Sequence, residues 1–170
     1  MTDPSMTPTP VHQVRRSRSP LTNGTWVLVA DGKKALLLEN VGDAERPVLE
    51  VRRADTQKNP ATSEQGTDRP GRRSDGPQGH RSALDETDWH RLEEARFADS
   101  LAGMLYDRAH RDGFRRLIVA ASPRVLGELR KVMHKEVADR IVGEVPKTLT
   151  HEPVDEIARH VSDALTPQED

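Results

Sequence analysis

The stretch Leu117-Ile118-Val119-Ala120-Ala121, followed directly by Ser122-Pro123, decides how this chain of 170 residues folds. Five consecutive apolar residues predict a strand that is buried on both faces of a sheet. Ser122 suits the N-cap of a helix, and proline is favoured at the first helical position. A buried strand that leads straight into a helix is typical of α/β proteins.

The chain after this stretch continues the alternation of strands and helices. A short strand is predicted for residues 141–145, ended by Pro146, and a last helix for about 152–165. Strands that alternate with helices lie parallel and are joined by right-handed crossovers. The apolar residues of the last helix share one face, and they are Val154, Ile157, Ala158, Val161 and Leu165.

The chain before the deciding stretch predicts three strands and one long helix. The strands are 26–30, 35–39 and 47–53, and the Asp31-Gly32 turn and short links make them an antiparallel meander. The helix covers about 85–110 and ends before Gly113. Its apolar stripe begins near Trp89 and consists of Phe97, Leu101, Met104 and Leu105.

The predicted order is therefore β-β-β-α-β-α-β-α. It indicates a single α/β domain in which a mixed five-stranded sheet carries helices on both faces, a ribonuclease H-like outline.

Two segments lack the apolar residues needed for a core. Residues 1–24 contain four prolines and three arginines, which predicts a disordered basic tail. Residues 54–83 are rich in glycine and proline and contain no Leu, Ile, Val or Phe, which predicts a long mobile loop. We therefore expect the folded domain to span 25–165, followed by a tail at 166–170.

The composition argues against several classes of protein. The absence of cysteine excludes disulfides and thiolate metal sites. Apolar runs of about five residues are too short for a transmembrane helix, and no secretory signal is visible, so we expect a cytoplasmic protein without membrane contact. No phosphate-binding, dinucleotide-binding or serine-hydrolase string occurs, and no two histidines have zinc-site spacing, so no cofactor or metal is expected.

The ribonuclease H-like outline also suggests a metal nuclease. Such enzymes need several carboxylates on the central strands. Asp31 could supply one and Glu86, Glu93 or Glu94 another, but the strand 117–121 has none. We therefore interpret Asp31 as a turn residue.

Two groups of residues are candidates for binding. Ser122 and Arg124, at a helix N-terminus after a parallel strand, could hold an anion, although an ordinary capped helix explains them too. In the loop, Gly76, Pro77, Gln78 and Gly79 form a turn-rich tip. Four flanking arginines suit contact with a phosphate backbone, namely Arg69, Arg72, Arg73 and Arg81.

Four strings resemble the bacterial host-attachment protein family, in the same order over about residues 25–165. They are residues 26–32 (Trp-Val-Leu-Val-Ala-Asp-Gly), 68–72 (Asp-Arg-Pro-Gly-Arg), 122–130 (Ser-Pro-Arg-Val-Leu-Gly-Glu-Leu-Arg) and 147–150 (Lys-Thr-Leu-Thr). That family is similar to the central domain of the archaeal and eukaryotic class-one release factor, which is ribonuclease H-like. The release-factor domain carries a Gly-Gly-Gln tripeptide on the loop before its long helix. This chain has Gly76-Pro77-Gln78 in the corresponding loop.

The resemblance implies three alternative functions. The first is a non-enzymatic factor that binds ribosome or RNA in the manner of the release-factor domain. The second is an attachment-related protein that acts through a protein partner. The third is a release or rescue factor that hydrolyses peptidyl-tRNA. Because proline replaces a glycine of the tripeptide, we expect no enzymatic activity. The oligomeric state stays open.

Overall fold

The fold consists of one mixed sheet and the helices that cover it. A computed structural model describes residues 19–57, 83–111 and 113–167. The sheet has the order β3-β2-β1-β4-β5, with β1–β2 and β2–β3 antiparallel and β1–β4 and β4–β5 parallel. The strands are β1 (Trp26–Ala30), β2 (Lys34–Asn40), β3 (Leu49–Thr56), β4 (Leu117–Ala120) and β5 (Ile141–Val145). The helices are α2 (Ala83–His110), α3 (Pro123–Val132), α4 (Lys135–Ala138) and α5 (Val154–Leu165). The predicted single α/β domain with a mixed five-stranded sheet is thus confirmed.

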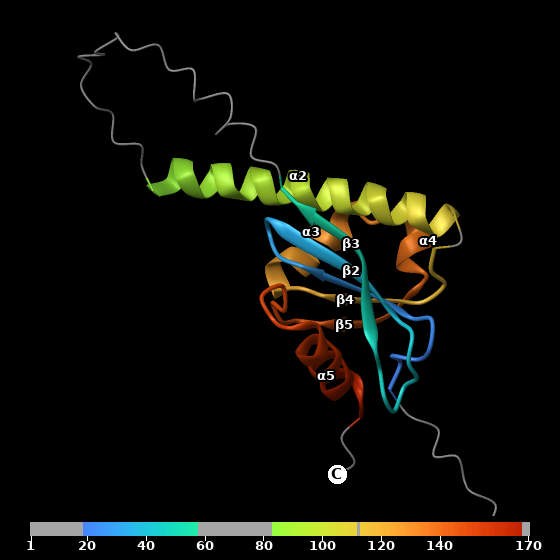
Figure 1. The fold of residues 1–170 in the computed structure, drawn as a ribbon. Helices are drawn as coiled ribbons and strands as arrows, with labels where there is room; N and C mark the ends of the chain where they lie inside the picture. Colours follow the sequence, from blue (N-terminus) through green and yellow to red (C-terminus); the bar gives the residue numbers. More distant parts are fainter. Residues whose placement is uncertain (1–18, 58–82, 112, 168–170) are drawn as a thin grey trace, which may run out of the picture.

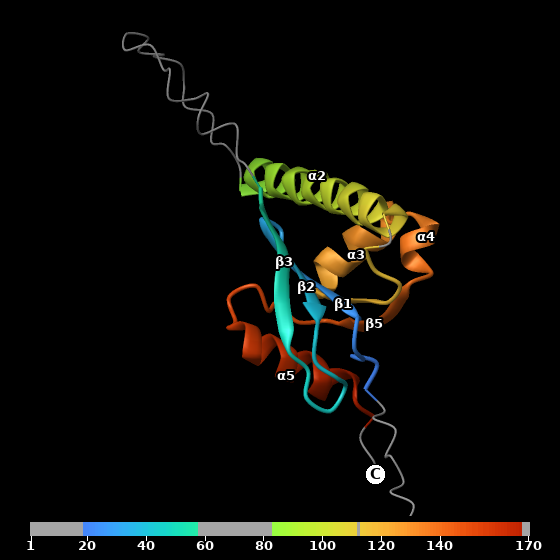
Figure 2. The same cartoon turned by 45° about the vertical axis from the view of Figure 1, so that its right-hand side comes forward.

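Helices cover both faces of the sheet, as predicted (Figures 1 and 2). On one face Leu28 and Val119 join a core with residues of α2, α3 and α4. On the other face Val27 and Ile118 join a second core with α5. Because successive side chains of a strand point to opposite faces, the central strands β1 and β4 need apolar residues at every position.

Among the described helices and strands, only the short helix α4 was not predicted from the sequence. It follows α3 after two residues and is four residues long. A single helical turn leaves no apolar repeat that a sequence pattern could reveal. None of the described helices is long and apolar enough to cross a lipid bilayer.

The packed chain begins before the predicted boundary at residue 25. Leu21 is fully buried in the core beneath α5, and Ser19 is buried as well. Asn40, at the end of β2, holds this segment. Its Nδ2 donates to the carbonyl oxygens of Leu21 at 3.0 Å and Thr22 at 3.1 Å. The basic tail therefore cannot include Leu21.

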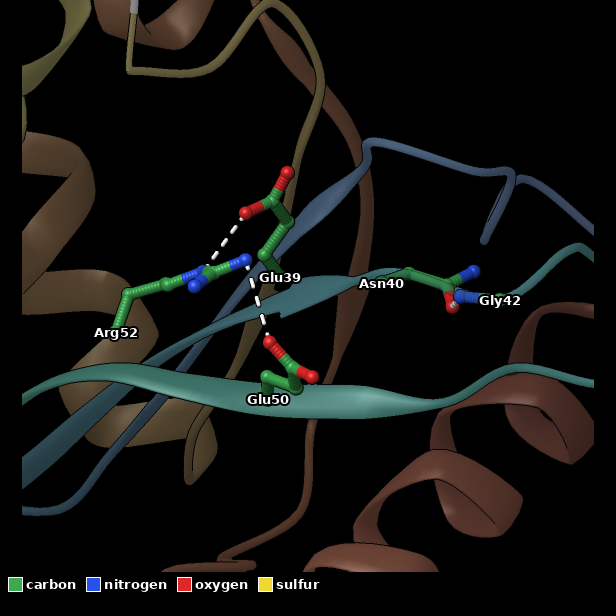
Figure 3. Close-up of polar contacts among 5 residues, drawn as sticks. All are labelled: Glu39, Asn40, Gly42, Glu50 and Arg52. Atoms are coloured by element: carbon green, nitrogen blue, oxygen red, sulfur yellow. Dashed lines mark hydrogen bonds and ion pairs between the residues drawn. The ribbon is translucent and has the colours of Figure 1, made fainter.

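The edge strand β3 differs from the prediction in length and shape. It continues to Thr56, so the segment between β3 and α2 begins later than residue 54. Its pairing with β2 shifts between Leu37 and Leu38, which leaves Arg52 as an extra residue. Figure 3 shows the Arg52 side chain between Glu39 and Glu50. Arg52 Nε lies 2.8 Å from Glu39 Oε2, and Arg52 Nη2 lies 3.3 Å from Glu50 Oε2. A bulge and exposed charges discourage another strand from pairing with this edge.

The long helix α2 ends as predicted but begins outside the core. A Cβ on Gly113 would lie 2.8 Å from the Arg108 carbonyl oxygen, so this helix end requires glycine. At the other end α2 extends past the strands (Figure 1), and residues 86–92 are all exposed. Trp89 is 48% exposed, so its expected place at the start of the apolar stripe is wrong. The stripe packs on the sheet only from Phe97 onward.

Candidate functional site

The candidate site lies where the parallel strands β1 and β4 end. Asp31 follows β1, and Ser122 follows β4 after one residue. Because the two neighbouring strands run in the same direction, both residues lie at the carboxyl ends of the strands, on the same side of the sheet. The carboxyl end of parallel strands is the usual place for ligand sites in α/β proteins.

Asp31 is a turn residue, as interpreted from the sequence, and its carboxylate is also tied to a distant segment. Its Oδ1 accepts hydrogen bonds from the backbone N–H groups of Lys33 and Lys34, both at 2.7 Å. Its Oδ2 accepts a hydrogen bond of 2.6 Å from Thr150 Oγ1, in the loop between β5 and α5. Because these three hydrogen bonds engage both oxygens of the Asp31 carboxylate, its role in this turn is structural.

The pKa of Asp31 reflects this environment. Partial burial raises the pKa, because it disfavours the charged form. The hydrogen bonds from Thr150, Lys33 and Lys34, together with the nearby His151, lower it. The lowering prevails, so the pKa of Asp31 lies below its ordinary value and the group stays ionised at neutral pH.

The predicted anion site, Ser122 and Arg124, lies at the start of α3. Ser122 is the N-cap residue, and its Oγ accepts a hydrogen bond of 3.3 Å from the Val125 N–H. Arg124 Nε lies 3.1 Å from Glu94 Oε2 of α2, which forms an ion pair. Binding of an anion by Arg124 would compete with this ion pair, so the anion site stays a prediction.

Glu94 also lies directly against the turn after β1. A Cβ on Gly32 would lie 2.8 Å from Glu94 Cγ, so only glycine allows this approach. Glu94 Oε2 is buried and receives no hydrogen bond from a described residue, although Arg124 balances its charge. The turn, α2 and α3 are thereby packed around one carboxylate.

A cleft of about 330 Å³ opens beside this contact. The turn after β1 forms one wall, and the N-terminal half of α2 forms the other. The cleft brings carboxylates, amines and imidazoles together, which suits a polar ligand rather than an apolar one. Its lining residues are Asp31, Gly32, Lys33, Lys34, Gln57, His90, Glu93, Glu94 and His151. Among the described residues no three acidic or histidine side chains are placed to hold a metal ion.

Gln57 fixes the end of β3 in this cleft. Its N–H donates to the Lys33 carbonyl oxygen at 2.6 Å, and its Nε2 donates to the Glu93 carbonyl oxygen at 3.1 Å. The chain then passes through residues 58–82 to the start of α2. The cleft therefore contains Gln57, the last described residue before the segment in which the other predicted site residues occur.

Those residues lie outside the described part of the chain. They are the loop tip Gly76, Pro77, Gln78 and Gly79 and the four arginines Arg69, Arg72, Arg73 and Arg81. Gln57, Thr150 and His151 are not among the site residues predicted from the sequence. Thr150 belongs to the string 147–150 that supports the family resemblance. Its bond to Asp31 could not be inferred from that string, because the two residues are 119 positions apart.

The sequence of the chain matches a known protein family. The sequence profile described as bacterial archaeo-eukaryotic release factor family 12 matches residues 24–161. The match spans all five strands and most of α5, and it confirms the predicted similarity to release factors. Its description names release factors and does not mention host cells, so the attachment role stays a prediction. No curated protein is significantly similar to the chain.

Proposed function

We propose that this chain, which belongs to bacterial archaeo-eukaryotic release factor family 12, is a non-enzymatic cytoplasmic factor that binds the ribosome. The observation that carries the proposal is the family match, because it covers nearly the whole domain rather than a short motif. The release-factor resemblance gives the mode of binding. In this mode the segment between β3 and α2 contacts the ribosome, and the folded domain holds the two ends of that segment.

The geometry of the described domain supports this division of roles. Gln57 fixes the end of β3 to α2, and α2 extends beyond the sheet with residues 86–92 exposed. A helix rises about 1.5 Å per residue, so the 28 residues of α2 span about 42 Å. The described residues that flank the segment 58–82 are therefore Gln57, which is fixed beside α2, and the exposed start of α2.

The charge of the segment supports contact with RNA. Residues 58–82 contain five Lys or Arg and three Asp or Glu, a net charge of +2 within a chain of net charge −2. Basic side chains bind nucleic acid by neutralising phosphates and releasing counterions. We assign this contact to Arg69, Arg72, Arg73 and Arg81.

Co-sedimentation of the purified chain with bacterial ribosomes tests the proposal. We expect the chain to pellet with ribosomes at low salt and to leave them as salt rises. Exchange of the four segment arginines for glutamine should abolish pelleting. A matched variant that exchanges four exposed arginines elsewhere should still pellet, and those residues are Arg46, Arg91, Arg111 and Arg115. A chain that never pellets, or two variants with equal loss, would contradict the proposal.

A further inference from the structure

The exposed part of α2 carries a surface that the proposed function does not use. Trp89 is 48% and Leu92 is 45% exposed, and they are three residues apart, so they are neighbours on one side of the helix. Both lie on the side away from the sheet, since the core residues Phe97, Leu101 and Leu105 occupy the opposite side. Two large apolar side chains that adjoin each other, each nearly half exposed, form a small apolar patch of the kind that suits a contact surface.

Acidic residues surround this apolar pair. Glu86 and Glu93 lie three and four residues from Trp89, and Asp88 lies four residues before Leu92, so all three adjoin the pair on the helix surface. Among the described residues none forms an ion pair with these three carboxylates. We call Glu86, Asp88, Trp89, Leu92 and Glu93 the outer α2 face. Glu93 forms the border of this face, because it also lines the cleft beside the β1–β2 turn.

The charge of the outer α2 face selects the kind of partner. Arg96 lies four residues after Leu92 and three after Glu93, so it adjoins this face, and three carboxylates against one guanidinium leave a net charge of −2 there. Arg91 lies on another side of the helix. The three carboxylates would repel a phosphate backbone at this surface, and like charges at an interface disfavour wrong partners. A suitable partner segment would cover Trp89 and Leu92 with apolar side chains. It would also pair Lys or Arg side chains with the carboxylates around them. We propose that the outer α2 face binds a basic amphipathic segment of another protein.

Trp89 itself can report the contact. The chain has two tryptophans, and Trp26 is buried against Phe114 with ring centroids 6.0 Å apart. In the full-length variant Trp26→Phe, fluorescence therefore comes from Trp89 alone. The probes are a Lys/Leu amphipathic helical peptide, a Lys/Ser peptide of the same length and charge, and single-stranded oligouridylate. We expect the Lys/Leu peptide to shift Trp89 emission to the blue and to shield it from acrylamide. The Lys/Ser peptide should bind about tenfold more weakly, and oligouridylate should leave Trp89 unshielded.

Matched variants separate the outer α2 face from general charge effects. The triple exchange Glu86→Gln, Asp88→Asn and Glu93→Gln should weaken Lys/Leu peptide binding about tenfold. The same loss of charge near α5, through Glu152→Gln, Asp155→Asn and Asp163→Asn, should change it less than about twofold. Leu92→Ser should weaken binding, whereas Val48→Ser, at an exposed apolar position away from α2, should not.

Three outcomes would overturn this inference. The first is equal weakening by the two triple exchanges. The second is shielding of Trp89 by oligouridylate but not by the peptide. The third is a Trp89 that is already shielded from acrylamide in the free protein, because the chain would then cover this face itself. Since no ribosome is present, these outcomes do not bear on the proposed ribosome binding.

Discussion

Thr150 Oγ1 donates a hydrogen bond of 2.6 Å to Asp31 Oδ2 and so joins the end of β1 to the loop after β5. Thr150 is buried, and Asp31 is partly buried. The bond ties two segments together at the carboxyl ends of the parallel strands β1, β4 and β5. It also keeps His151 beside the cleft between the β1–β2 turn and α2.

Removal of this bond should change the dependence of stability on pH. Asp31 has a lowered pKa in the folded protein, so its stabilising contribution is full above the ordinary aspartate pKa of about 3.9 and is lost as the pH falls through the folded value. Thr150→Val, which keeps the shape of the side chain, should lower the free energy of unfolding by about 1.5–3 kcal/mol at pH 7 and by less at pH 3. Urea unfolding at both pH values measures this. The exposed Thr148→Val is the control, and an equal loss for Thr150→Val at both pH values would contradict the role of the Asp31 charge.

Asn40 should be among the most sensitive polar positions of the fold. Its Oδ1 accepts from the N–H groups of Gly42 (Figure 3) and Val48, both at 3.0 Å, in addition to the bonds that its Nδ2 donates to Leu21 and Thr22. Asn40→Ala should cost about 3 kcal/mol of unfolding free energy, because it leaves several buried groups unpaired. Asn23→Ala removes one exposed bond and should cost less than about 1 kcal/mol. Similar losses in chemical denaturation would contradict this account.

Two glycine-to-alanine exchanges should act in opposite directions. Gly32→Ala would place a Cβ 2.8 Å from Glu94 Cγ and should cost about 1–3 kcal/mol. Gly103 lies inside α2, and a Cβ there would meet nothing within 4 Å, so Gly103→Ala should add about 0.5–1 kcal/mol of stability. Melting curves measure both. In a double-mutant cycle Glu94→Ala should relieve much of the Gly32→Ala cost, and independent effects would show that the contact does not matter.

The docking of α5 on the sheet should depend on Ile157. This residue is fully buried between α5 and the sheet, so Ile157→Asp would bury an unpaired charge. We expect a loss of about 3 kcal/mol or more in unfolding free energy. Ala164→Asp, on the exposed side of the same helix, should have little effect. An unchanged melting temperature for Ile157→Asp would mean that α5 is peripheral.

The chain should not release peptide from peptidyl-tRNA on ribosomes with an empty A site. The resemblance aligns Gly76-Pro77-Gln78 with the Gly-Gly-Gln tripeptide of release factors, and a proline lacks the N–H group of a glycine and restricts the residue before it. Loss of one well-placed donor can cost about 10²–10³ in rate. Pro77→Gly should gain release activity in the same assay. If the natural chain already releases peptide and Gln78→Ala abolishes this, the rescue-factor function replaces the non-enzymatic one.

The candidate site is less accessible to sequence reasoning than the fold. Ser122 and Asp31 can be found because capping and turn residues leave local signals. The ion pair of Arg124 with Glu94 and the bond of Thr150 to Asp31 join segments that are distant in sequence, so no spacing could reveal them. The sequence places Trp89 in the apolar stripe because helical periodicity does not show where a helix leaves its sheet.

The sequence by itself determined the order of the main elements and the mixed sheet, because the apolar runs of β1 and β4 can be satisfied only by burial on both faces. It also determined the face of α5 that packs, since helical periodicity is local. The tertiary structure decided that Leu21 belongs to the core, that Arg52 forms a bulge in β3, and that α2 extends past the sheet. These features depend on contacts between segments that are distant in sequence. A local pattern of residues does not show which of these contacts lower the free energy of the folded state.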